Sequence, residues 1–284
     1  MALGLLADRA FGEPPVTPHP VSLFGRAMRG VESRVWRDSR PAGVVHAGAG
    51  LTLGVAAGAA TRSTALATYV AVAGRALGQA AMAVADALEA GDLDLARERL
   101  PALVGRDPTG LDEKEIARAA VESVAENTVD AVVAPALWAL ALGAPGALGY
   151  RAVNTMDAMV GHRSERYARY GWAAARLDDA AGLVPARVTA LMVAAVRPGA
   201  AKAIRRTVRA DAPAHPSPNS GVAEAAFAAA LGLRLGGESR YGDRVELRPP
   251  LGDGRPPEPA DIASAVRLSR DVTYALAASV AVFS

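Results

Sequence analysis

The chain has no cysteine among its 284 residues, which excludes disulfide bonds, thiol nucleophiles and thiolate metal sites. Aromatic residues are also scarce, at 5% of the chain, and there are 28 glycines. Strand-rich proteins use more aromatic and β-branched residues. Small residues such as alanine and glycine instead let helix backbones approach one another closely. The composition therefore predicts an all-α protein.

A strong charge of either sign is lacking as well, since the formal net charge is only +2. Such a balance creates no field that would attract nucleic acid, so no nucleic-acid partner is expected. The only lysines are Lys114 and Lys202, and codon bias is the simpler explanation for the excess of arginine. The phosphate loop G-x-x-x-x-G-K-[ST] and the nucleophile elbow G-x-S-x-G are both absent from the sequence.

Several apolar runs are present. Residues 42–60 carry no charge and are about long enough to span a bilayer, with a buried soluble helix as the alternative. Two further runs of about 14 residues are separated by Gly143–Gly146, and each would be only about 21 Å long. Neither crosses a hydrocarbon core of about 30 Å alone, so a re-entrant hairpin is expected. The predicted apolar helices are 42–60, 64–85, 129–143, 146–160, 181–197 and 272–283.

The basic clusters between these runs predict the topology, because positive residues favour the cytoplasmic side of a membrane. We expect one membrane domain over residues 1–284. It is predicted to be an all-α, polytopic helical bundle with short or re-entrant helices, in the cell membrane, with cytoplasmic polar loops and a cytoplasmic active site. Residues 1–41 read as loop with one short basic helix, and 210–262 as loop around one helix near 222–233.

Three acidic residues give the sharpest chemical signal. Glu122, Glu126 and Asp130 follow at i, i+4 and i+8, so a helix carries them on one face. Carboxylates stacked in this way repel one another unless a cation lies between them. Mg²⁺ prefers carboxylate oxygens and keeps waters for substrate phosphates. A magnesium site is therefore predicted, and a salt-bridged helix face with Arg118 and Arg151 is the alternative.

Other polar residues gather around this segment. Asn127, Asn154 and Asp157 offer further oxygen ligands. The stretch H-R-S-E-R-Y at 162–167 alternates charges, which suits an anionic substrate or a solvated helix end. Two histidines stand between prolines on stiff loops, and H-P-S-P-N-S-G, which begins at the second, offers a small anion-binding nest ahead of a helix.

Several motifs together resemble the CobD/CbiB family of cobalamin biosynthesis. They are G-E-P-P-V-T-P-H-P, V-G-R-D-P-T-G-L-D, A-V-E-S-V-A-E-N-T-V-D, Y-R-A-V-N-T-M-D-A-M-V-G-H-R, Y-G-W-A-A-A-R-L-D-D, H-P-S-P-N-S-G and R-P-P-L-G-D-G-R. They occur in order over nearly the whole chain. The resemblance implies an integral membrane adenosylcobinamide-phosphate synthase. Such enzymes join a propionate of adenosylcobyric acid to the amine of (R)-1-amino-2-propanol O-phosphate or ethanolamine phosphate, driven by ATP.

The reaction fits the polar residues, because a carboxylate needs activation before it forms an amide, most simply as an acyl phosphate. That step needs Mg²⁺ and positive charge near the transferring phosphoryl group. The lipid bilayer and other membrane enzymes of late cobalamin synthesis are expected partners. The hypothesis assigns metal binding to Glu122, Glu126 and Asp130; catalysis to Glu122, Glu126, Asn127, Asp157 and Glu165; and substrate binding to His19, Arg151, Asn154, Arg163, Arg176, Asp178, Asp179, His215, Ser217 and Asn219.

Two other function classes remain open from the residues. A Mg²⁺-dependent, prenyltransferase-like membrane enzyme also uses acidic clusters on a helical bundle, but D-x-x-x-D and D-D-x-x-D spacings are absent here. A non-catalytic corrinoid-binding or assembly subunit is the second alternative. Protein that binds corrinoid but never turns over ATP or amine would favour it.

Overall fold

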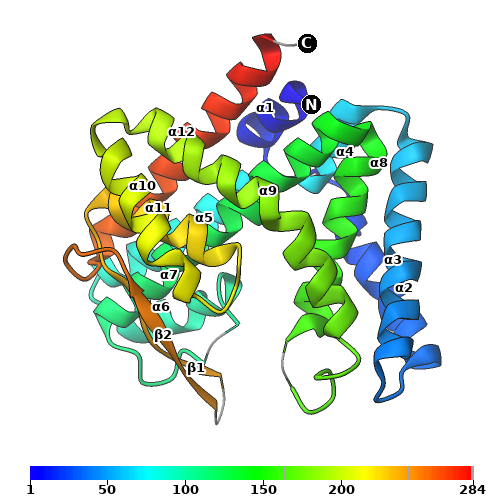
Figure 1. Ribbon diagram of the computed structural model, residues 1–284, viewed down its shortest axis with the longest axis horizontal. Helices are drawn as coiled ribbons and strands as arrows, with labels where there is room; N and C mark the ends of the chain where they lie inside the picture. Colours follow the sequence, from blue (N-terminus) through cyan, green and yellow to red (C-terminus); the bar gives the residue numbers. More distant parts are fainter. Residues whose placement is uncertain (106, 163, 242–243, 283–284) are drawn as a thin grey trace. The chain divides into compact units, whose positions relative to one another are not determined.

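The computed structural model describes residues 1–105, 107–162, 164–241 and 244–282, and helices dominate it (Figure 1). The all-α prediction is confirmed. Contacts divide the chain into two compact units, of which the first combines Met1–Ala73, Asp130–Pro185 and Ala277–Ser284. The second unit combines Gly74–Val129 and Ala186–Leu276.

The first unit begins with four helices, and capping residues explain the starts of the last three. In each case a side chain accepts a hydrogen bond from the backbone N–H group two or three residues further on, and so satisfies a donor that the helix leaves unpaired. The capping residues are His19 for α2, Ser39 for α3 and Ser63 for α4. The helices of this unit are α1 (Ala2–Phe11), α2 (Pro20–Val35), α3 (Arg40–Thr61), α4 (Thr64–Ala71), α8 (Ala134–Met156) and the first part of α9 (Trp172–Val196). Single π-helical turns at Val129–Val133 and Asp157–Gly161 flank α8.

Glycines allow α3 to pack closely against α8. Gly50, Gly54 and Gly58 are spaced four residues apart and are buried on one face of α3. A Cβ atom at Gly54 would lie 2.5 Å from the Cβ of Ala152 and 2.8 Å from the carbonyl oxygen of Leu148. The absence of side chains on this face therefore sets the distance between the two helices.

Gly143 breaks α8 into two pieces, as the sequence predicts. Its φ of 67° and ψ of −150° are not helical, and Pro145 follows two residues later. A Cβ at Gly146 would collide with the carbonyl oxygen of Trp138. In a straight helix residues eight apart are separated by about 12 Å along the axis. The chain therefore folds back on itself at Gly143, which forms the helical hairpin expected there.

Three helical segments are long and apolar enough to cross a membrane. They are Arg40–Thr61, Glu113–Gly161, which includes the break at Gly143, and Trp172–Val196. Large apolar side chains on all three are exposed, among them Val45 at 57%, Leu140 at 56% and Val184 at 66%. Apolar side chains that find no protein partner suit contact with lipid.

The second unit positions the candidate site. It contains α5 (Gly74–Glu89), α6 (Leu93–Arg99), α7 (Glu113–Thr128), the end of α9, α10 (Ala201–Ala210), α11 (Ser220–Leu231) and most of α12 (Pro259–Val282). Strands β1 (Leu235–Tyr241) and β2 (Arg244–Leu251) form an antiparallel hairpin after α11. Gly232, at a φ of 68°, ends α11 and turns the chain toward β1.

The predicted helix at 64–85 is wrong as a single element. It is two helices, α4 and α5, separated at Val72 and Ala73. Val72 is extended, and the backbone N–H of Ala73 donates to the carbonyl oxygen of Ala131, 2.9 Å away. A contact with a segment almost sixty residues away thus replaces the next helical hydrogen bond.

Other elements also differ from the predictions. Residues 1–41 contain the unpredicted α1 besides the expected basic helix, which is α2. The expected helices at 181–197 and 272–283 begin earlier, at Trp172 and Pro259, and residue 283 lies outside the described residues. The helix expected near 222–233 is α11, but the β-hairpin that follows it was not predicted.

Candidate functional site

Helix α7 carries the first part of the site. Its start is fixed by a capping box, in which Asp112 accepts from the N–H of Glu115 at 2.8 Å and Glu115 accepts from the N–H of Asp112 at 2.9 Å. The helix then continues to Thr128, so Glu122 and Glu126 lie on one face, one turn apart. Glu122 is buried, at 2% exposure, while Glu126 is half-buried.

Asn127 faces its own helix. Its side-chain amide donates to the carbonyl oxygen of Ser123 at 3.0 Å and to the Ser123 hydroxyl at 3.1 Å. The Ser123 hydroxyl in turn donates to the carbonyl oxygen of Leu103 at 2.7 Å. Asn127 thus helps to hold the loop before α7 in place, in addition to any role in catalysis.

The segment H-P-S-P-N-S-G forms the second part of the site. The Ser217 hydroxyl accepts from the N–H groups of Asn219 at 3.2 Å and Ser220 at 3.1 Å, and so holds the backbone at the start of α11. Two amides that the predicted anion nest would use are therefore already bound within the loop. A Cβ at Gly221 would collide with His215, so the glycine lets the imidazole pack against the start of the helix.

These two parts meet at one short hydrogen bond. The Ser220 hydroxyl donates to Oε1 of Glu126 at 2.6 Å, across 94 positions of sequence. Arg187 orders the same loop, because it donates to the carbonyl oxygen of Pro218 at 3.0 Å and to the side-chain oxygen of Asn219 at 3.3 Å. The acidic motif and the histidine motif therefore form one cluster within the second unit.

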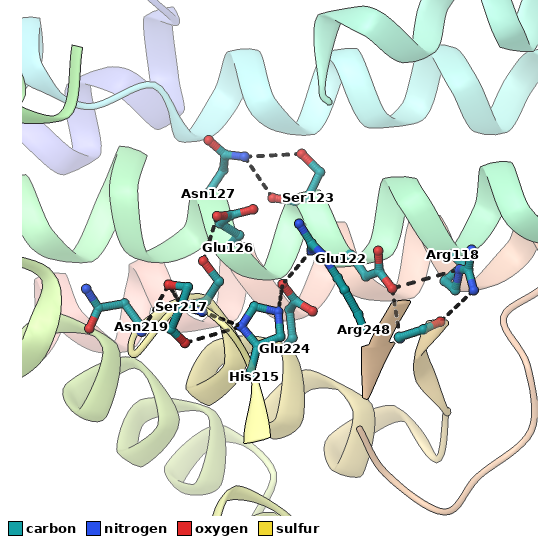
Figure 2. Close-up of polar contacts among 12 residues, drawn as sticks. Arg118, Glu122, Ser123, Glu126, Asn127, His215, Ser217, Asn219, Glu224 and Arg248 are labelled. Atoms are coloured by element: carbon teal, nitrogen blue, oxygen red, sulfur yellow. Dashed lines mark hydrogen bonds and ion pairs between the residues drawn. The ribbon is translucent and has the colours of Figure 1, made fainter. Parts of the chain in front are cut away.

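A buried charged group that the sequence analysis missed lies beneath this cluster. Glu224 of α11 is fully buried, and its Oε1 lies 3.8 Å from Nε2 of His215 and 3.7 Å from a guanidinium nitrogen of Arg248 on β2 (Figure 2). The available signal was the acid itself, since Glu224 is the only charged residue in the run S-G-V-A-E-A-A-F-A-A-A-L. A buried charge among alanines requires a partner, and Arg248 is that partner.

The hairpin is tied to α7 by Arg118 and Glu122. Oε1 of Glu122 accepts from the N–H of Gly236 at 2.9 Å and lies 3.9 Å from Nε of Arg118. The guanidinium group of Arg118 donates to the carbonyl oxygens of Gly236 at 2.5 Å and Glu238 at 2.7 Å. The salt bridge with Arg118, which the sequence analysis gave as the alternative to a metal site, is therefore present at Glu122. Glu122 also fixes the start of β1.

His215 is kept neutral at neutral pH. Burial is the main cause that lowers its pKa below 6.5, and Arg248 lowers it further, although the hydrogen bond to Ser217 and the carboxylates of α7 oppose this. Nδ1 lies 3.1 Å from the backbone nitrogen of Ser217 and 3.2 Å from its carbonyl oxygen, so it accepts from the amide in one tautomer and donates to the carbonyl oxygen in the other. Nε2 faces Glu224, whose Oε1 is 3.8 Å away.

The remaining predicted residues lie in the first unit, except Arg163, which is outside the described residues. Asp130 accepts from the Tyr150 hydroxyl at 3.3 Å, and Asn154 donates to Asp178 at 3.3 Å. The others in this unit are His19, which caps α2; Arg151, which is half-buried in α8; Asp157, in the π-helical turn; Glu165, which is exposed; and Arg176, which pairs with Asp179 at 2.9 Å.

Within the described part of the chain, no group of three or more His, Asp or Glu side chains is placed to hold a metal ion. Glu122 and Glu126 still fit the chemistry of Mg²⁺, which is often bound by one or two carboxylates with water and substrate phosphates as further ligands. The contribution of Asp130 to such a site stays a prediction.

The family model and the curated relatives that match this chain all point to the same family. The family model described as CobD/Cbib protein matches residues 1–269. A cobalamin biosynthesis protein CobD from Mycobacterium tuberculosis (strain ATCC 25618 / H37Rv) is 50% identical over 285 residues, covering 95% of this chain and 90% of that protein. The protein of the same name from Pelobacter propionicus is 43% identical over 273 residues, covering 89% and 84%. No solved structure matches this chain.

Proposed function

The chain belongs to the CobD/CbiB family and acts in cobalamin biosynthesis, and from this premise we propose that it is an adenosylcobinamide-phosphate synthase. It would form an amide between a propionate of adenosylcobyric acid and an amino-alcohol phosphate, at the expense of ATP. The observation that supports this most is the meeting of two polar motifs at the 2.6 Å bond between Ser220 and Glu126.

The chemistry has two steps. The propionate oxygen attacks the terminal phosphorus of ATP, which forms an acyl phosphate and releases ADP. The amine nitrogen then attacks the acyl carbon, the carbon–oxygen bond to phosphate breaks, and the amine gives up its proton as the amide forms. Mg²⁺, when bound, would supply positive charge that offsets the charge developing on the transferring phosphoryl group.

The residues of the second unit have separate roles in this proposal. Glu122 and Glu126 would hold Mg²⁺ with the nucleotide, and the Ser220 hydroxyl orients the Glu126 carboxylate for that purpose. Glu126 is the better exposed of the two carboxylates and carries one hydrogen bond from Ser220. His215 and Glu224 are buried and support the loop that carries Ser220, so they are positioning residues.

The polar residues of the first unit keep the roles that the motifs predict for them. Arg151 and Arg176 would neutralise phosphates, together with Arg163. Asp157 or Glu165 would accept the proton of the amine. These assignments come from the motifs alone, and they predict that charge reversal at Arg176 raises the KM for the amino-alcohol phosphate more than it changes binding of the corrinoid.

The reaction is tested by incubating the detergent-solubilised protein with adenosylcobyric acid, aminopropanol phosphate, ATP and Mg²⁺. Mass analysis should show the gain expected for amide formation, and the gain should vanish without ATP. Corrinoid binding without any mass gain would instead support the non-catalytic corrinoid-binding alternative.

The site is tested with Ser220→Ala, for which Ser264→Ala on the exposed face of α12 is the control. Loss of a charge-assisted hydrogen bond is worth about 1.5–3 kcal/mol, so turnover should fall by about tenfold or more in the first variant only. Full activity of Glu126→Ala would refute the assignment of the site.

The side of the membrane that the second unit faces is tested by labelling one introduced cysteine. Because the chain contains none, a cysteine introduced at the exposed Lys202 is the only thiol available to a reagent. An impermeant maleimide should label Lys202→Cys in inverted vesicles and not in intact cells, if the second unit faces the cytoplasm. Labelling of intact cells would contradict that orientation.

A further inference from the structure

A cavity of about 680 Å³ lies within the second unit, between the N-terminal end of α7 and the β-hairpin. Cavities of about 300–1,000 Å³ are the usual size of small-molecule sites. Its walls come mainly from the first turns of α7, the two strands and the loop before α12, with Ala214 and Arg234 beside them. It is distinct from the buried cluster around Glu224, but it shares Arg118 and Arg248 with it.

Basic side chains dominate the charge of the cavity. Lys114, Arg118, Arg234 and Arg248 line it, against the two carboxylates of Asp112 and Glu115. Both carboxylates are engaged by backbone N–H groups in the capping box. Lys114 and Arg234 are exposed, and among the described residues neither forms an ion pair. The cavity is therefore built to receive an anion.

The opposite wall is apolar and stiff. Four prolines, at 249, 250, 256 and 257, line it beside Leu235 and Leu247. Leu247 is 83% exposed at this wall. Prolines have little conformational freedom to lose, so such a wall is preorganised for a flat, apolar group. The ligand should accordingly combine several negative charges with a planar ring.

The floor of the cavity connects it to the candidate site. Gly236 and Gly237 have φ values of 87° and 103°, which favour glycine. A Cβ at Gly237 would collide with the guanidinium group of Arg118, so the glycines let Arg118 reach across the hairpin. Arg118 lies 3.9 Å from Glu122, and Arg248 lies 3.7 Å from Glu224. Anionic groups bound to these arginines would lie next to the carboxylates of Glu122 on α7 and Glu224 on α11.

We propose that this cavity is the binding site for a nucleoside triphosphate, with the phosphates on the basic residues and the base against the proline wall. The identification of that nucleotide as a substrate rests on the proposed function. Of the other two reactants, an amino-alcohol phosphate has no ring to cover the apolar wall. The corrin reactant carries no phosphate to match the cations.

The test is the binding of a fluorescent ATP analogue to the purified, detergent-solubilised protein without corrinoid. The double variant Lys114→Glu/Arg234→Glu should bind about tenfold more weakly or worse, because two charge-assisted contacts become repulsive. Lys202→Glu, an exposed lysine on α10 outside the cavity, is the control and should bind as the wild type does. Equal affinity in the double variant and the control would overturn the proposal.

A second measurement does not depend on the charge reversals. Lys114→Cys carries the only thiol, and its labelling by a charged methanethiosulfonate should be slowed by ATP and much less by adenosine or inorganic phosphate. Stronger protection by aminopropanol phosphate than by ATP would also overturn the proposal. If amide formation needs ATP but the double variant binds ATP normally, the nucleotide site in this cavity is refuted and the proposed reaction is supported. If the double variant binds nucleotide more weakly as expected but the wild type forms no amide, the proposed reaction is refuted and the nucleotide site is supported.

Discussion

The pairing of Glu224 with Arg248 leads to a quantitative prediction. Glu224 is fully buried and the Arg248 side chain is 15% exposed, with 3.7 Å between their charged atoms. At an effective dielectric constant of about 20, their attraction is about 4.5 kcal/mol. Removing one partner of a buried pair costs about 3–5 kcal/mol, because the other charge stays buried. Glu224→Gln should therefore lower the free energy of unfolding by about 3 kcal/mol.

A double-mutant cycle isolates the pair from the other contacts of each side chain. With Glu224→Gln, Arg248→Met and the double variant, we expect a coupling energy of at least about 2 kcal/mol. The control cycle is Arg206→Met with Asp253→Asn, whose charged atoms are closer, at 3.1 Å, but whose side chains are 68% and 86% exposed. Exposed pairs contribute about 0–1 kcal/mol, so the longer but buried contact should couple more strongly.

Guanidinium titration in micelles, followed by circular dichroism, measures these energies. Tryptophan fluorescence would not serve, because Trp36, Trp138 and Trp172 all lie in the other unit. Titration at pH 8 keeps His215 neutral in both the folded and unfolded states, so its protonation does not enter the comparison. A coupling energy no larger than that of the exposed pair would refute the reasoning that burial makes this contact strong.

Three further predictions follow from contacts elsewhere in the chain. Burial lowers the pKa of His215 below 6.5, so the unfolded state binds the proton more readily than the folded state does. The free energy of unfolding should therefore be constant above about pH 6.5 and decrease below it. In denaturation curves, His215→Gln should make that decrease smaller. Gly54→Leu should abolish folded protein in size-exclusion chromatography, while Gly48→Leu, on the same helix with open space around it, should not. Glu32→Ala removes the acceptor for the hydroxyl of Tyr167, 2.9 Å away, so trypsin should cleave residues 164–171 several-fold faster; an unchanged rate would show that other contacts hold this loop.

The sequence was sufficient wherever the cause of a structure is local. The capping box at Asp112 and Glu115 has such a local cause, because both hydrogen bonds join residues three positions apart. The hairpin at Gly143 follows from the conformational freedom of glycine and the missing N–H group of Pro145. The spacing of Glu122 and Glu126 also places both on one face, since a helix repeats every 3.6 residues.

The sequence failed where a distant contact decides the outcome. The helix predicted at 64–85 ends at Ala71 because Ala73 bonds to Ala131. The strands of the hairpin were not predicted. Strand β1 contains two glycines, of which Gly236 is held by α7 through Arg118, and β2 ends in R-P-P-L, whose prolines interrupt a strand pattern.

The composition and the motifs by themselves determined the helical fold class, the family and the residues that carry polar chemistry. Only the tertiary structure decided which of those residues meet. Ser220 reaches Glu126 across 94 positions, and Gly236 reaches Glu122 across 114. The buried charge of Glu224 is paired with Arg248, which lies on a different element. Periodicity records how a residue relates to its neighbours along the chain, whereas a buried charge is stabilised by whichever partner the packing of the helices brings to it.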